Sequence, residues 1–97
     1  MALSYQESGD LMTDIPFRQR VKVACLHFAE YILDESAATA AHNTRFRWAQ
    51  GAMADPDGTA SRVQSAVVMD PQVQTDGSAI TDQNLQASVE TAIQKML

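Results

Sequence analysis

The sequence is poor in residues that bind metals or form covalent cross-links. It contains one cysteine, Cys25, so no disulfide can form within the chain. Ala24 and Leu26 on either side indicate a buried, apolar thiol rather than a nucleophile. The two histidines, His27 and His42, are too few and too isolated to form a zinc or iron site with that cysteine. We therefore expect no metal and no cofactor.

Motifs of catalysis are also lacking. The glycines are scattered, so they provide no glycine-rich phosphate-binding loop: Gly9, Gly51, Gly58 and Gly77. The acidic residues form no recognisable catalytic pair, and nothing resembles a nucleophile elbow. The sequence therefore favours a protein that is not an enzyme and has no catalytic residues.

Long apolar runs are absent as well. No run approaches the roughly 20 residues that span a bilayer, and residues 1–12 lack the basic and apolar blocks of a signal peptide. We expect synthesis in the cytoplasm and no membrane contact.

Hydrophobic residues make up 45% of the 97 residues, an ordinary value for one small globular domain. Because so small a domain builds only a modest core, oligomerisation is an expected source of further burial.

Basic residues are fewer than acidic ones and are unevenly placed. Seven basic residues against twelve acidic ones give a formal net charge of −5, which argues against general binding to DNA phosphates. Six acids lie from Asp55 onward, with only Arg62 and Lys95 as basic residues there, whereas the first half carries Arg18, Arg20, Lys22, Arg45 and Arg47. Two interpretations stay open: the halves complement a second copy head-to-tail, or the charges only solvate helix faces.

Apolar spacing predicts a long central helix. Its apolar face repeats every three or four residues, through Phe17, Val21, Ala24, Cys25, Phe28 and Ile32. Thr13 or Asp14 is the expected N-cap, with Pro16 in the first turn. Residues 1–14 are expected to form an arm or a short helix, because Ser4 and Glu7 have capping-box spacing.

The middle of the chain predicts two further segments. Asn43 is the expected N-cap of a helix with Phe46, Ala49 and Met53 on one face. The sequence DPDG, residues 55–58, is expected to end that helix as a turn. Thr59 or Ser61 is then the expected cap of a segment running to residue 69. We favour helix there, although residues 67–69 also fit a short strand.

The C-terminal segment, residues 81–97, predicts an amphipathic helix after an extended loop or arm over residues 71–79. Thr81 is the expected N-cap, Asp82 suits the first turn, and Ile80 can pack on Leu85. An apolar stripe follows, and it either closes the bundle or docks on a partner. Leu85 and Val89 fit the first interpretation, whereas we assign Ile93, Met96 and Leu97 to a docking surface. The predicted fold is all-α, one domain spanning residues 1–97, with a bundle of three to four helices.

One short stretch concentrates arginine and aromatic residues: HNTRFRWAQ, residues 42–50. Arg45, Arg47 and Trp48 fit an exposed anchor patch, because arginine and tryptophan are favoured at interfaces. The alternative is that Phe46 and Trp48 pack inside the domain while the arginines pair with Glu30, Asp34 or Glu35. No turn of the helix-turn-helix kind is visible here.

Four strings carry a family resemblance: FRQRVKVACLHFAEYIL, HNTRFRWAQ, VVMDPQV and ITDQNLQASVETAIQKML. Together they resemble a family of small virion structural proteins of tailed bacteriophages. The resemblance covers residues 17–97, and its motifs are structural rather than catalytic. In that setting, a helical protein of this size resembles the head-to-tail connector, or adaptor, class.

The resemblance implies a set of partners. The protein would form a homo-oligomeric ring of about twelve subunits in the virion, between the portal protein and the tail or nozzle proteins. DNA would pass through the channel only as cargo. The resemblance identifies no particular contact residue. From the basic residues themselves, we expect neighbouring subunits or the portal to contact Arg18, Arg20 and Lys22, or Arg45 and Arg47. The alternatives are a capsid decoration or cement protein and a small helical DNA-binding regulator.

Overall fold

Four α-helices make up most of the chain that the structure describes. The computed structural model describes residue 11 and residues 14–36, 44–73 and 79–97. The helices are α2 (Ile15–Ser36), α3 (Thr44–Ala54), α4 (Pro56–Val67) and α5 (Asp82–Met96), and the described residues contain no strand. The predicted all-α bundle is therefore confirmed, and the segment after residue 61 is helical up to Val67.

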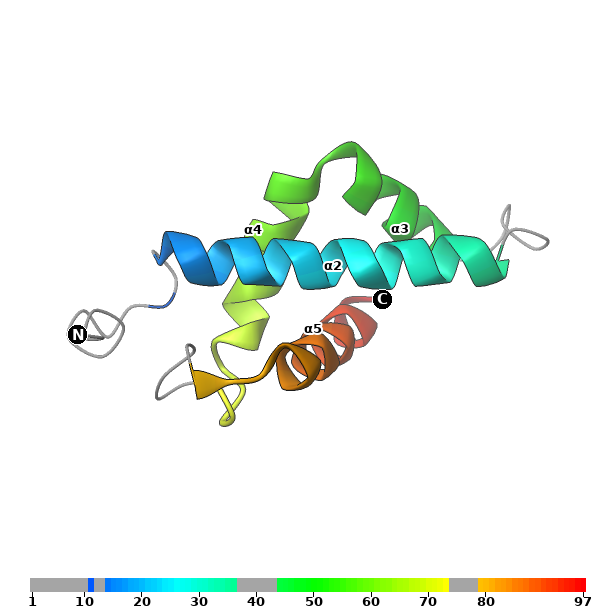
Figure 1. Ribbon diagram of the computed structural model, residues 1–97. Helices are drawn as coiled ribbons and strands as arrows, with labels where there is room; N and C mark the ends of the chain where they lie inside the picture. The colour runs from blue at the N-terminus through cyan, green and yellow to red at the C-terminus, as the bar shows by residue number, and fades with distance from the viewer. Residues whose placement is uncertain (1–10, 12–13, 37–43, 74–78) are drawn as a thin grey trace.

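Helix α2 is the central element, and each of the other three helices contacts it. Figure 1 shows α2 running across the molecule, with α3 on one side, α5 on the other and α4 crossing behind it. Asp14 caps α2 as predicted, because its Oδ1 accepts the Phe17 backbone N–H at 2.8 Å. The predicted face is buried, through Phe17, Val21, Ala24, Cys25, Phe28 and Ile32, and the structure adds Ala29 to it.

The DPDG sequence has a different role from the one predicted. It does end α3, but α4 begins at once at Pro56, with Asp55 as the N-cap. The Asp55 Oδ1 accepts the Gly58 backbone N–H at 3.1 Å. Proline is well suited to the first helical position, since the N–H that it lacks has no partner there. Thr59 therefore lies buried inside the helix and Ser61 lies beyond its first turn, so neither is the cap.

The chain between α4 and α5 is partly described. Residues 70–73 form a tight turn in which Val73 N donates to the Asp70 carbonyl at 2.8 Å, and the Val73 side chain is fully buried. The Ser88 hydroxyl of α5 donates to Asp70 Oδ2 at 2.8 Å. This part of the predicted loop is thus packed against the bundle rather than extended. Residues 74–78 lie outside the described residues.

Helix α5 closes the bundle with its apolar stripe. Thr81 is the N-cap, as predicted, and its side chain accepts the Asn84 backbone N–H at 3.1 Å. Leu85, Val89 and Ile93 are almost completely buried. Burying side chains of this size stabilises the fold by about 1.5–3 kcal/mol each.

One buried amide joins the start of the described chain to the core. Gln64 of α4 is only 1% exposed. Its Nε2 donates to the Leu11 carbonyl at 2.6 Å, and its Oε1 accepts a hydrogen bond from Arg18 Nε at 3.1 Å. The Leu11 side chain is buried in the same core. The predicted short helix near Ser4 and Glu7, the alternative cap Thr13 and the predicted cap Asn43 lie outside the described residues.

The Asp55 cap leads to a test by double substitution. A Cβ at Gly58 would overlap the Asp55 carboxylate. We therefore expect Gly58→Ala to lower the free energy of unfolding or leave it unchanged, because the capping side chain must move. Asp55→Ala alone should cost about 0.5–2 kcal/mol. In the Asp55→Ala background, Gly58→Ala should instead stabilise the protein by up to about 1 kcal/mol, since alanine is the better helix former.

Urea unfolding of the four proteins measures these differences. Additive effects of the two substitutions would contradict the assigned cap.

Candidate functional site

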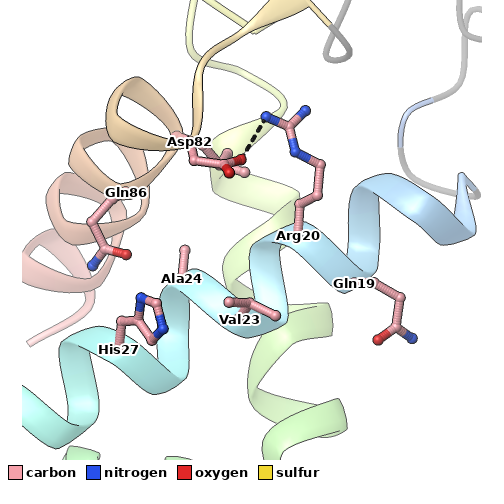
Figure 2. A pocket seen from close by; sticks show the side chains of 8 residues that line it. Gln19, Arg20, Val23, Ala24, His27, Asp82 and Gln86 are labelled. Carbon is pink, nitrogen blue, oxygen red and sulfur yellow. Dashed lines mark hydrogen bonds and ion pairs between the residues drawn. The ribbon is translucent and has the colours of Figure 1, made fainter.

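A surface groove lies between α2 and α5, and we call it the α2–α5 groove. It has a volume of about 290 Å³ and is lined by Gln19, Arg20, Val23, Ala24, His27, Asp82, Leu85 and Gln86. Figure 2 shows Val23 and Ala24 along α2, with the Arg20–Asp82 pair at one end and His27 near Gln86 at the other. Sites that receive a side chain or a small ligand usually have a mostly apolar lining with a few polar groups, as this groove has.

The three basic residues near the start of α2 are engaged within the chain. Arg20 donates from its guanidinium to the Ile80 carbonyl at 2.6 Å and to Asp82 Oδ1 at 3.1 Å. Lys22 Nζ lies 3.2 Å from Asp57 Oδ1. Arg18 bonds to Gln64, as described above. Arg18, Arg20 and Lys22, predicted as contacts to a neighbour or portal, thus connect α2 to α4 and to the start of α5.

These contacts use the charge difference between the two halves of the chain. The basic partners lie on α2, and the acidic partners, Asp57 and Asp82, lie beyond residue 55. Because the carboxylate side chains are 83% and 94% exposed, each ion pair adds at most about 1 kcal/mol. Basic residues of the first half and acidic residues of the second half therefore pair inside one chain at these positions, and these pairs orient helices more than they stabilise the fold.

The arginine and aromatic stretch divides between the core and the surface. Trp48 is half-buried and packs on Phe28, with ring centroids 6.2 Å apart. The Arg45 guanidinium lies 5.7 Å from the centroid of the same Phe28 ring, a cation–π distance. Trp48 and Arg45 therefore take part in the contact between α3 and α2. Arg47 is exposed, and two residues further along a helix it faces the opposite side from Arg45. His42 lies outside the described residues.

Tyr31 extends this aromatic cluster to the surface of α2. Its ring stacks on Phe28 with centroids 6.5 Å apart, yet 53% of the residue is exposed. A hydrogen bond to Glu35 and the negative charge of that carboxylate raise the pKa of Tyr31 above its ordinary value of 10.0. Tyr31 is thus a large, protonated, half-exposed aromatic residue of the kind that protein interfaces favour.

The predicted docking residues of α5 also divide between the core and the surface. Ile93 is fully buried in the core, so the structure places it with Leu85 and Val89 as a residue that closes the bundle. Met96 and Leu97 are 45% and 43% exposed. The apolar stripe of α5 therefore extends past the core, and only its last two residues lie at the surface.

Sequence reasoning missed the α2–α5 groove because its walls are some 60 positions apart in the sequence. Neither His27 nor Gln86 stands out in a motif. Val23 gave the one available signal, since it lies outside the narrow apolar stripe of α2, and it is half-exposed at the groove.

The described residues offer little reactive chemistry. They contain no group of three or more His, Cys, Asp or Glu side chains placed to hold a metal ion. The residues that line the groove include no serine, threonine or cysteine. Among the described helices, none is long and apolar enough to cross a membrane.

Cys25 is inaccessible, and burial raises the pKa of its thiol from 9.0 to about 12. We expect no reaction with Ellman's reagent in the native protein at pH 8 and rapid reaction in urea, because the thiolate is the reactive form. Because the folded protein holds this proton more tightly, Cys25 should lower stability as the pH rises from 9 towards 12. Equal labelling rates in the folded and unfolded protein would contradict the buried position.

Arg45 and Arg47 should differ when they are reversed. Arg45→Glu removes the cation–π contact with Phe28, so we expect a loss of about 0.5–1 kcal/mol in the free energy of unfolding. Arg47→Glu leaves this cation–π contact in place, because Arg47 projects from the opposite side of α3. Thermal unfolding followed by circular dichroism measures both variants. An Arg45→Glu protein as stable as the native one would contradict the cation–π contact.

Known proteins offer no counterpart to this groove. No protein-family model, no curated protein and no solved structure matches this chain.

Proposed function

We propose that this protein is a non-enzymatic structural subunit of a phage virion, a head-to-tail connector whose ring joins the portal to the tail. The observation that carries the proposal is the position of its exposed apolar side chains. Val23 lines the α2–α5 groove and Tyr31 is exposed further along α2, whereas Met53 lies on α3, which is on the opposite side of α2 from α5 (Figure 1). A subunit with binding surfaces on different sides can join head-to-tail, which is the contact that builds closed rings.

The small core supports the same proposal. A domain of 97 residues buries a smaller share of its surface than a larger one does. Neighbouring subunits would cover the half-exposed residues Val23, Tyr31 and Met53. Association would then stabilise each subunit by mass action, because only the folded form joins the ring.

The charge balance suits a channel that DNA passes through. The net charge of −5 gives the subunit no general attraction for phosphates. A channel wall of this kind lets the duplex slide, whereas a strongly basic wall would retain it. In this proposal DNA is cargo.

The portal contact is assigned to the end of α5. Met96 and Leu97 are the exposed continuation of a buried apolar stripe. An amphipathic helix end of this kind can enter an apolar groove of a partner. Arg18, Arg20 and Lys22 have roles inside the chain, so the proposal no longer requires them for contacts between proteins.

The copy number in purified virions tests the function. We expect about a dozen copies per particle, as one closed ring at the portal demands, measured by quantitative mass spectrometry against the major capsid protein. Hundreds of copies would instead indicate a decoration or cement protein of the shell. Absence from the particle would reject a virion role, and a salt-dependent DNA-binding assay would then test the regulator alternative.

A further inference from the structure

The side of α2 that is turned away from the core also carries apolar residues. Ile15 is 65% exposed and Val23 50% exposed, and Leu26 and Leu33 are half-buried. An amphipathic helix that packs on one side only carries polar residues on its opposite side, whereas a helix that is apolar all round is usually buried all round. This side of α2 therefore offers apolar surface for a second molecule to cover.

The residues along this side follow one another in a symmetric order, and we call them the α2 outer face. At about 100° per residue, six positions fall within roughly 80° of the helix circumference. They are Ile15, Gln19, Val23, Leu26, Glu30 and Leu33. From either end, the order of these residues is apolar, polar, apolar, and their spacing is nearly symmetric about a centre between residues 24 and 25. A face of this kind matches itself when a second copy lies antiparallel.

One antiparallel alignment brings like residues together along the whole face. Val23 lies opposite Leu26 of the second copy, and Gln19 lies opposite Glu30, because the numbers of each pair sum to 49. Ile15 and Leu33 sum to 48 and lie on the same edge of the face, so they also meet. From residue 19 to residue 33, the positions are separated by four, three, four and three residues. This is the spacing at which the side chains of two helices interlock.

The polar residues of the face determine the direction of the second helix. Within the described part of the chain, the Gln19 and Glu30 side chains make no hydrogen bond or ion pair. In the antiparallel alignment, the Gln19 carboxamide can donate to the Glu30 carboxylate. A parallel second copy would instead place Glu30 opposite Glu30 and Asp34 opposite Asp34. Like charges in facing positions disfavour such a contact, so the charges of the face select the antiparallel copy.

We propose that α2 of a second copy of this chain packs antiparallel on the α2 outer face, so that the free protein is a symmetric dimer. Both copies use the same face, so the contact is isologous and ends at the pair. The inference goes beyond the proposed function and does not depend on it. Because a ring would also cover Val23, a subunit would leave the dimer when it joins the ring.

Single engineered cysteines test the proposal. In the dimer, the two Val23 residues are offset by three positions, about 4.5 Å along the helices. A short bis-maleimide should therefore link two Val23→Cys proteins. Gln19→Cys alone and Glu30→Cys alone should not link, because each residue is about 16.5 Å along the helices from its own counterpart, whereas an equal mixture of the two should link. The buried native Cys25 does not compete for the reagent.

Three results would overturn the proposal. Dimers from Gln19→Cys alone and from Glu30→Cys alone, in the same yield as from their mixture, would mean that the helices run parallel. Variants that stay monomeric at millimolar protein concentration, with native circular dichroism spectra, would exclude the contact. Ser61→Cys is the control, since Ser61 is an exposed residue of α4 outside the face. An equal yield from Ser61→Cys and Val23→Cys would show that linkage needs only random collision.

An exchange of the polar pair provides a second test. Gln19→Glu places two carboxylates opposite each other, so we expect the dissociation constant of the dimer to rise about tenfold, equivalent to 1.4 kcal/mol. Adding Glu30→Gln to the same chain exchanges the two residues and should restore the native dissociation constant. Ser61→Glu is the matched control, because it adds the same charge outside the face. Sedimentation equilibrium measures these proteins. An equal loss with Ser61→Glu, or no recovery in the double variant, would contradict the pair.

Discussion

The apolar face of α2 is the surface on which the rest of the described fold is assembled. Helices α3, α4 and α5 each contact α2, and Phe17 and Val21 on that face are fully buried. Helices α3, α4 and α5 cover α2 only in part, and Val23 and Tyr31 on α2 stay half-exposed. The α2–α5 groove lies where α5 meets α2, so the packing that creates the core also determines the position of the candidate binding surface.

Polar contacts determine how the helices are placed around that core. Each ion pair of α2 is exposed and weak. Together with the hydrogen bond between Arg18 and the buried Gln64, these pairs connect α2 to α4 and to the start of α5. The energy of the fold comes mainly from apolar burial, which is not directional. Hydrogen bonds and ion pairs are directional, so they set the orientation of the helices relative to one another. Arg20 illustrates this, because it reaches both a backbone carbonyl and a carboxylate at the start of α5.

The sequence predicted the helices better than it predicted the contacts between them. The buried face of α2 and the caps Asp14 and Thr81 follow from spacing and local chemistry, which a sequence displays directly. The start of α4 was misplaced because aspartate, proline and glycine favour turns and helix starts alike. Ile93 was assigned to docking because periodicity identifies an apolar stripe but not where along it the core ends.

The candidate site was harder to predict for a related reason. Its walls come from the first and last helices of the described fold, and the sequence gives no measure of which side of α2 remains uncovered. Arg45 and Arg47 show the difficulty on a smaller scale. They are chemically identical and two positions apart, yet Arg45 lies over Phe28 and Arg47 projects from the opposite side of α3.

The single-residue connection between α3 and α4 has a mechanical consequence. Only Asp55 separates the two helices, and its side chain is occupied in capping α4. A force applied to α3 therefore reaches α4 with almost no slack. Helix α4 holds Leu11 through Gln64 and Lys22 through Asp57, so the strain spreads to the beginning of α2. The protein pulled at α3 should therefore respond with α3, α4 and the start of α2 moving as one stiff body.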